Sequence, residues 1–128
     1  MVESLNKTAE LVAKGTYFTT FSAYGHIMIG DEGFEFYEDR NVQNFVQIPW
    51  DEIDLVVASL LFGGKWIPRF KIQTKRNGSF IFAAREPKRV LKAMTNHIDP
   101  NHVVRALTFT QNITRNLKAI LAKHNRQA

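Results

Sequence analysis

The stretch Phe70-Lys71-Ile72-Gln73-Thr74-Lys75-Arg76-Asn77-Gly78-Ser79-Phe80-Ile81-Phe82-Ala83 decides the fold class. Apolar and polar residues alternate through 70–74, and an aromatic, apolar run follows at 79–83, as expected for strands with a buried face. Between them, Asn77-Gly78 is the strongest short signal for a hairpin turn. The stretch therefore predicts an antiparallel hairpin within a β-rich body.

Working outward, further short segments before this hairpin have the composition of strands. The turn Asp31-Glu32-Gly33 joins two of them, and Gly33 is available there for a positive φ. A second turn is expected at 50–54, after Pro49, which removes a strand hydrogen-bond donor. The expected strands before the hairpin are 10–18, 24–30, 33–38, 44–48 and 55–59. About seven strands at short spacing favour a sandwich or an open barrel.

The periodicity changes after residue 85. Glu86-Pro87 is expected to open a helix, because proline is tolerated in a first turn. Its apolar stripe is Val90, Leu91, Met94, His97 and Ile98, with Lys88, Arg89 and Lys92 opposite. The helix should stop at Asp99-Pro100-Asn101, and a second helix is expected from about Thr110, with Ile113, Leu117, Ile120 and Leu121 at helical spacing. The predicted class is α+β.

Length and composition favour one domain over residues 1–128. The chain has 128 residues, 45% of them apolar, and no cysteine, which excludes disulfides and thiolate metal sites. The first residues contain no apolar run of the kind found in signal peptides, and no stretch is long enough to span a bilayer. We therefore expect a cytoplasmic protein, with peripheral association at the inner face of the cell membrane as an option.

Charge is distributed unevenly along the chain. Residues 1–84 carry eight Lys and Arg against ten Asp and Glu, whereas residues 85–128 carry nine against two. The segment 31–54 contains eight carboxylates and a single cation, Arg40. A molecule polarised in this way attracts anionic partners such as phosphates, acidic protein surfaces or a membrane face.

Catalytic and metal-binding motifs are not apparent. The four histidines lack the close spacing of a zinc site, and ordinary core or surface histidines are the favoured interpretation. Asp51, Glu52 and Asp54 could act as acid and base groups, but a solvated turn explains them better. Gly63-Gly64-Lys65 lacks the remaining residues of a phosphate-binding loop. We therefore expect no enzyme, no catalytic or metal residues and no cofactor.

The segment 60–69 is the strongest candidate for a contact surface. It places large apolar residues around Gly63-Gly64, with cations beside Trp66, which suits a membrane interface or a protein hot spot. The alternative is that its apolar residues simply finish the flanking strands. With the basic helix face, the predicted partner or membrane contacts are Leu61, Phe62, Lys65, Trp66, Arg69, Lys88, Arg89 and Lys92. Nucleic-acid binding is not favoured, because no recognition motif accompanies the basic residues.

A second aromatic cluster precedes residue 25. Tyr17, Phe18, Phe21 and Tyr24 are interleaved with Thr and Ser. They could form an exposed aromatic loop or the end of a strand that packs on the core. Packing on the core is the favoured interpretation.

Two motifs resemble a bacterial family. The runs 34–42, with Phe34-Glu35-Phe36-Tyr37, and 46–53, with Ile48-Pro49-Trp50-Asp51-Glu52-Ile53, are similar to the ManO-like family of small Firmicute proteins, domain of unknown function 956. So are 69–72 and 80–83. The resemblance covers nearly the whole chain and carries over no catalytic residue.

The resemblance implies a fold and a partner. The expected fold is similar to pleckstrin-homology (PH) and GRAM domains, a seven-strand bent sheet closed by a helix, here with one further C-terminal helix. The implied function is a non-enzymatic accessory or regulator of a mannose-type sugar phosphotransferase permease, bound to its subunits at the cytoplasmic membrane face. Direct binding to anionic lipid without a permease partner is the alternative.

Overall fold

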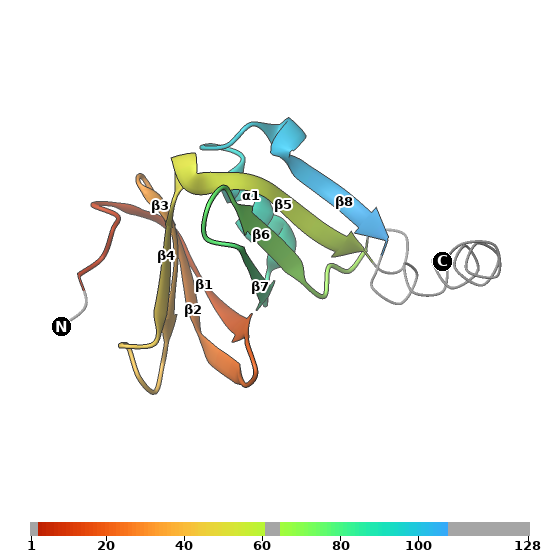
Figure 1. The fold of residues 1–128 in the computed structure, drawn as a ribbon. Helices are drawn as coiled ribbons and strands as arrows, with labels where there is room; N and C mark the ends of the chain where they lie inside the picture. Colours follow the sequence, from red (N-terminus) through yellow and green to blue (C-terminus); the bar gives the residue numbers. More distant parts are fainter. Residues whose placement is uncertain (1–2, 61–64, 108–128) are drawn as a thin grey trace.

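One eight-stranded sheet and a short helix make up the computed structural model of the chain, which describes residues 3–60 and 65–107 (Figure 1). The strands follow the order β4-β3-β2-β1-β7-β6-β5-β8 across the sheet. Their bounds are β1 Ala9–Phe18, β2 Ser22–Gly30, β3 Gly33–Glu38, β4 Phe45–Pro49, β5 Ile53–Leu60, β6 Phe70–Thr74, β7 Ser79–Ala84 and β8 Val103–Leu107. The helix α1 spans Pro87–Met94, and two 3-10 turns, η1 Trp50–Glu52 and η3 Pro100–His102, precede β5 and β8.

The sheet is open and mixed. All neighbouring strands are antiparallel except β5 and β8, which are parallel, and β4 and β8 form the two edges. In Figure 1 the β1–β4 half runs at a steep angle to the β5–β8 half, so the sheet is strongly bent. The α+β class is confirmed. The sandwich expectation is wrong, because β1 pairs with both β2 and β7 and joins the halves into one sheet.

Aromatic side chains fill the bend of the sheet. Phe34, Phe36, Phe70 and Phe82 are almost completely buried, and their rings contact one another. The helix adds three buried residues to the same core, namely Val90, Leu91 and Met94. Each such side chain contributes roughly 1.5–3 kcal/mol through burial, so the helix is held mainly by its apolar stripe.

The hairpin that decides the fold class is confirmed. β6 pairs with β7, and Gly78 in their turn has a φ of 78°, a conformation that glycine adopts readily. A positive φ at Gly33, however, was a wrong expectation. Gly33 lies within β3, where a Cβ would collide with the carbonyl oxygen of Ile48 on β4. Close strand packing, and not a turn conformation, explains that glycine.

The chain after residue 94 differs most from expectation. The helix ends at Met94, so His97 and Ile98 lie beyond it, and Val103–Leu107 forms a strand that periodicity did not predict. β8 runs parallel to β5, and its partner is more than forty residues away in the sequence. The second helix expected from about Thr110 lies outside the described residues.

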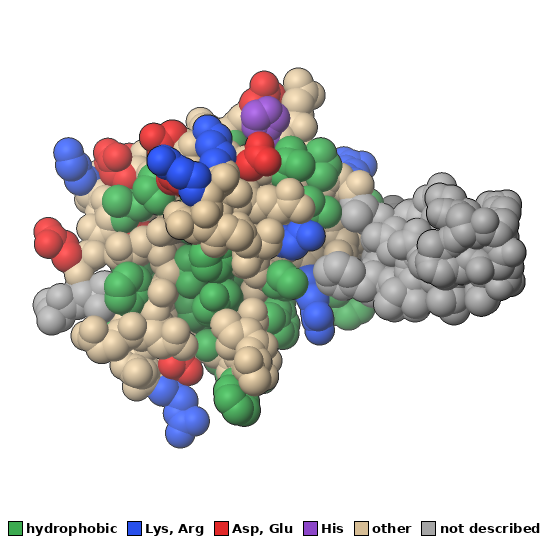
Figure 2. All heavy atoms as spheres, viewed as in Figure 1, with side chains coloured by type: hydrophobic (Ala, Val, Ile, Leu, Met, Phe, Trp, Pro, Cys, Tyr) green, Lys and Arg blue, Asp and Glu red, His purple; other side chains and the backbone are tan. Residues whose placement is uncertain are grey.

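The aromatic cluster at the β1–β2 hairpin divides between core and surface. Tyr17 packs on the core, as favoured, but Phe21 and Tyr24 are 80% and 67% exposed. Figure 2 shows apolar side chains at the far end of this hairpin, whereas acidic and basic side chains intermix at the opposite end of the sheet. The core interpretation is therefore wrong for Phe21 and Tyr24.

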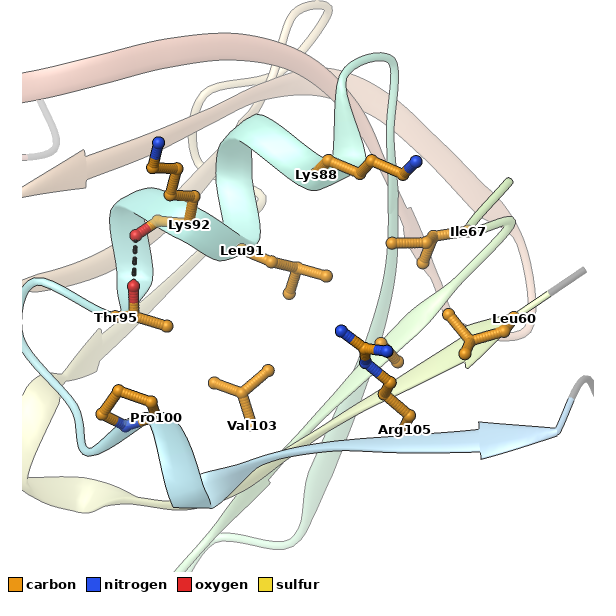
Figure 3. A pocket seen from close by; sticks show the side chains of 10 residues that line it. Leu60, Ile67, Lys88, Leu91, Lys92, Thr95, Pro100, Val103 and Arg105 are labelled. Atoms are coloured by element: carbon orange, nitrogen blue, oxygen red, sulfur yellow. Dashed lines mark hydrogen bonds between the residues drawn. The ribbon is translucent and has the colours of Figure 1, made fainter. Parts of the chain in front are cut away.

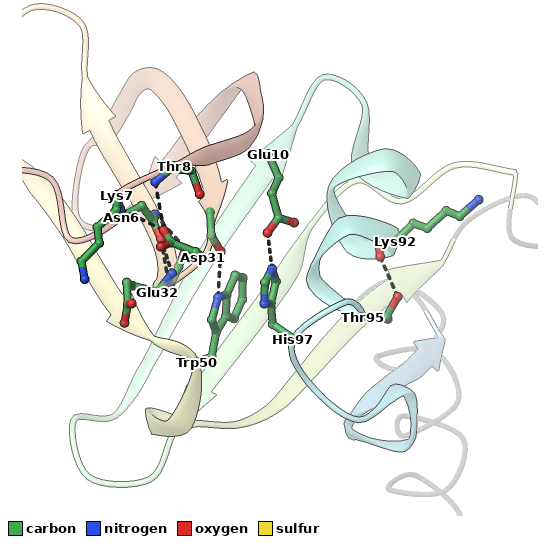
Figure 4. Close-up of polar contacts among 12 residues, drawn as sticks. Asn6, Lys7, Thr8, Glu10, Asp31, Glu32, Trp50, Lys92, Thr95 and His97 are labelled. Atoms are coloured by element: carbon green, nitrogen blue, oxygen red, sulfur yellow. Dashed lines mark hydrogen bonds and ion pairs between the residues drawn. The ribbon is translucent and has the colours of Figure 1, made fainter.

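A polar clamp fixes the segment that follows α1 (Figure 4). The Nε2 atom of His97 lies 2.7 Å from an oxygen of Glu10 on β1. The His97 ring stacks on Trp50, with centroids 4.7 Å apart and ring planes within 5°. Trp50 in turn donates a hydrogen bond of 2.9 Å to the Gly30 carbonyl oxygen. This clamp sets the path of the chain from α1 to β8.

A second polar network pins the N-terminal segment to β3. The Glu35 side chain is fully buried and accepts hydrogen bonds from the Ser4 hydroxyl at 2.6 Å, the Leu5 N–H at 3.0 Å and the Asn6 amide at 2.7 Å. Tyr37 and Gln47 also donate to it. These donors hold the pKa of Glu35 below its usual value, although burial acts in the opposite direction.

Candidate functional site

A groove of about 580 Å³ lies between α1 and the strands β5 and β8 (Figure 3). Its volume is within the range of small-ligand sites, which is roughly 300–1,000 Å³. Mostly apolar side chains form its walls, and three cations join them. The lining residues are Ala58, Leu60, Ile67, Lys88, Leu91, Lys92, Thr95, Pro100, Val103 and Arg105.

The helix supplies one wall because of its amphipathic pattern. Leu91 faces inward with the buried stripe, and the exposed Lys88 and Lys92 flank it, one helical turn apart. In Figure 3 the Lys88 side chain runs along the rim towards Ile67, whereas the Lys92 ammonium points away from the cavity. Lys88 is therefore the helix cation best placed to contact an occupant.

Strand β8 supplies the opposite wall. In the parallel register, Val103 is opposite Val56 and Arg105 is opposite Ala58, so these side chains share a face of the sheet. Val56 and Ala58 are buried, which makes this the face turned towards α1. Figure 3 shows the Arg105 guanidinium pointing into the groove. Arg105 is thus a cation on a sheet face where its neighbours Val56, Ala58 and Val103 are apolar.

The groove carries uncompensated positive charge. No Asp or Glu is among its lining residues. Within the described ranges, Lys88, Lys92 and Arg105 form no ion pair, whereas the neighbouring Arg89 lies 3.5 Å from a carboxylate oxygen of Glu86. An anion with an apolar body is the chemical complement of such a surface.

The predicted contacts Lys65, Trp66, Arg69 and Arg89 do not line the groove. Trp66 is 50% exposed and Lys65 is exposed, so neither is sealed in the core. The Arg69 guanidinium sits 4.5 Å from the centroid of the Phe18 ring, a cation–π contact with β1. Leu61 and Phe62 lie outside the described residues. Among the predicted contacts that the structure describes, Lys88 and Lys92 line the groove.

Sequence reasoning missed Arg105, which points most directly into the groove. The signal was the β-branched pair Val103-Val104 before Arg105, which favours a strand and places Arg105 on the same strand face as Val103. This run was not identified as a strand, and therefore Arg105 was not considered.

The acidic and basic segments meet away from the groove. Arg76 on the β6–β7 turn lies 2.6 Å from a carboxylate oxygen of Glu52. Its hydrogen bond holds the pKa of Glu52 below the usual value. This ion pair joins the acidic segment 31–54 to a cation of the β6–β7 turn, away from the groove.

Other sites of chemistry are sparse in the part of the chain that the structure describes. No group of three or more His, Cys, Asp or Glu there is arranged to hold a metal ion. His26 and Asp39 form a pair on the surface, with 2.7 Å between Nδ1 of His26 and a carboxylate oxygen of Asp39. None of the described helices has the length and apolar character needed to cross a membrane.

Comparison with known proteins identifies the family. The family model described as domain of unknown function (DUF956) matches residues 1–117, so the chain belongs to this family. No curated protein matches the chain. One similar solved structure is a crystal structure of the C-terminal domain of an unknown protein from Leishmania infantum, with 13% identity and a TM-score of 0.61. The match covers 70% of this chain and 83% of that chain, and at this identity it shows the fold alone.

Proposed function

We propose that this DUF956 member is a non-enzymatic accessory or regulatory binding protein of a mannose-type sugar phosphotransferase permease, acting at the cytoplasmic membrane face. The observation that supports a binding role is the surface at Lys65 and Trp66, where both side chains are exposed, Trp66 to 50%. The choice of partner rests on the sequence resemblance to the ManO-like family.

We also propose that the fold is a PH- or GRAM-like sheet with an added edge strand. Seven antiparallel strands in succession, followed by a helix packed in the bend of the sheet, support this relationship. β8 would then be an addition that pairs with β5 and creates one wall of the groove. In this interpretation the groove is a feature of the added segment.

Co-purification from native membranes tests the proposed partner. Tagged wild-type protein should retain permease subunits, and the double variant Trp66→Ala with Lys65→Ala should retain about tenfold less, because an exposed aromatic residue and its cation are typical hot-spot groups. Lys75→Ala, an exposed cation outside the predicted surface, is the matched control. Failure of the wild-type protein to retain any permease subunit would contradict the proposal.

Direct binding to anionic membranes is the second candidate function. The half-exposed Trp66 beside Lys65 favours it, since aromatic rings and cations meet at headgroup level. Sedimentation with vesicles should then increase with the anionic lipid fraction and decrease with salt. Binding that changes with neither the anionic lipid fraction nor the salt concentration would contradict this candidate function.

A further inference from the structure

Arg105 is placed unusually for an arginine. It shares a sheet face with the buried Val56 and Ala58, and its guanidinium points into the groove between apolar walls. Among the described residues it has no carboxylate partner. A guanidinium offers a planar set of donors that matches the two oxygens of a carboxylate or phosphate.

The surroundings of Arg105 restrict what such an anion is attached to. Leu60, Ile67, Leu91 and Val103 line the groove around it; Ile67 and Leu91 are buried, whereas Leu60 and Val103 are partly exposed. A small hydrated anion would leave this apolar lining in contact with water, whereas an aliphatic chain would cover it. The volume of about 580 Å³ is sufficient for one such chain and excludes a folded partner from the interior.

We propose that this groove binds a single-chain amphiphilic anion. Its carboxylate or phosphate pairs with Arg105, with Lys88 at the rim as a second cation, and its aliphatic chain lies against Leu60, Ile67 and Leu91. This ligand site goes beyond the proposed function and does not depend on a permease partner.

An inward-pointing charge also has a purely structural interpretation. β8 is an edge strand, and charged side chains on edge strands prevent sheets from pairing with other copies. That interpretation requires a charge at Arg105 but no ligand, no contribution from Lys88 and no preference for an aliphatic chain. The two explanations therefore differ in what binding experiments will show.

Isothermal titration calorimetry of the full chain tests the proposal with four probes below their micelle-forming concentrations. Decanoate and decyl phosphate should each bind saturably with one site per chain. 1-Decanol, which lacks the charge, and butyrate, which lacks the long chain, should each bind about tenfold more weakly or worse. Tighter binding of decanoate would indicate a fatty-acid source of the ligand, and tighter binding of decyl phosphate would indicate a phospholipid source.

Three variants assign the binding to the groove. Arg105→Gln should weaken both anions by about tenfold or more, because a charge-assisted hydrogen bond is lost, and Lys88→Gln by about threefold. Arg89→Gln is the matched control, since Arg89 is the neighbour of Lys88 on α1 but does not line the groove. It should bind like the wild type. Because Arg105 and Lys88 lie on different elements, a folding defect in one variant leaves the other as a test.

Several results would overturn the proposal. These are an absence of saturable anion binding to the wild type, equal affinity for decanoate and 1-decanol, or equal affinity for decanoate and butyrate. Unchanged affinity in folded Arg105→Gln would do the same. If Arg105→Gln self-associates while its affinity for decanoate is unchanged, the edge-protection interpretation is correct and the ligand site is not.

Discussion

Glu35 and Arg105 are both charged residues on strands, yet the chain treats them in opposite ways. Glu35 is fully buried, and six side-chain or backbone groups donate hydrogen bonds to it. Arg105 is exposed and faces an apolar groove, without an ion-pair partner in the described part of the chain. The fold therefore satisfies the charge of Glu35 with its own hydrogen bonds, whereas the charge of Arg105 stays available for a ligand.

The physical basis of this contrast is the cost of desolvation. A buried carboxylate is tolerated only when hydrogen bonds replace its water, and the donors around Glu35 do so. Arg105 is exposed and keeps its hydration, so its charge adds little to stability, and a charge without an ion-pair partner among the described residues is typical of functional positions. The comparison therefore predicts that the first residue matters for folding and the second for binding.

The largest effect is expected from removal of the Glu35 carboxylate. Glu35→Ala removes the acceptor that the Ser4 hydroxyl and the Leu5 N–H share, and it should lower the free energy of unfolding by about 3–5 kcal/mol. Glu38→Ala on the same strand, where the carboxylate accepts only a long exposed hydrogen bond, should cost less than about 1 kcal/mol. Urea denaturation measures both. Equal losses of unfolding free energy in the two variants would show that the hydrogen bonds to Glu35 stabilise the fold no more than the exposed hydrogen bond of Glu38.

The dependence of stability on acidic pH also tests whether the Glu35 carboxylate stabilises the fold. The pKa of Glu35 in the folded protein lies below its usual value, so the unfolded chain binds the proton more tightly. The stabilisation is therefore complete above the ordinary glutamate pKa and is lost as the pH falls through the depressed value. Urea denaturation at a series of pH values should show a shallower decline for Glu35→Gln than for the wild type. Parallel curves would show that Glu35 does not control acid unfolding.

Local pattern was sufficient for the strands β1 to β7 but not for β8 or for this network. The alternation of Phe34, Glu35 and Phe36 places the two rings on one face of the strand, in the core, and the carboxylate on the opposite face, which in antiparallel sheets is commonly exposed to solvent. That face is instead covered by Ser4 and Asn6. The covering segment is about thirty residues distant in the sequence, and periodicity within one strand carries no information about it.

The same limit explains why two of the three cations that line the groove were predicted as contacts and the third was missed. Lys88 and Lys92 were selected because helix periodicity is local and strong. Arg105 was missed because β8 is defined by parallel pairing with β5. Such a contact depends on where the clamp of His97 and Trp50 directs the chain, and no short sequence window reports it.

The smallest effect on stability, and the sharpest contrast with Glu35, is expected at Arg105 itself. Arg105→Leu places an aliphatic side chain against Leu91 and Val103, so the free energy of unfolding should be unchanged or increased by up to about 1 kcal/mol. Urea denaturation checks the stability, and decanoate titration of the same sample should show affinity reduced by about tenfold or more. Arg89→Leu, on the solvent side of α1, should change neither quantity appreciably. A loss of more than about 1 kcal/mol in Arg105→Leu would mean that the guanidinium stabilises the fold as Glu35 does, and the distinction between the two charges would disappear.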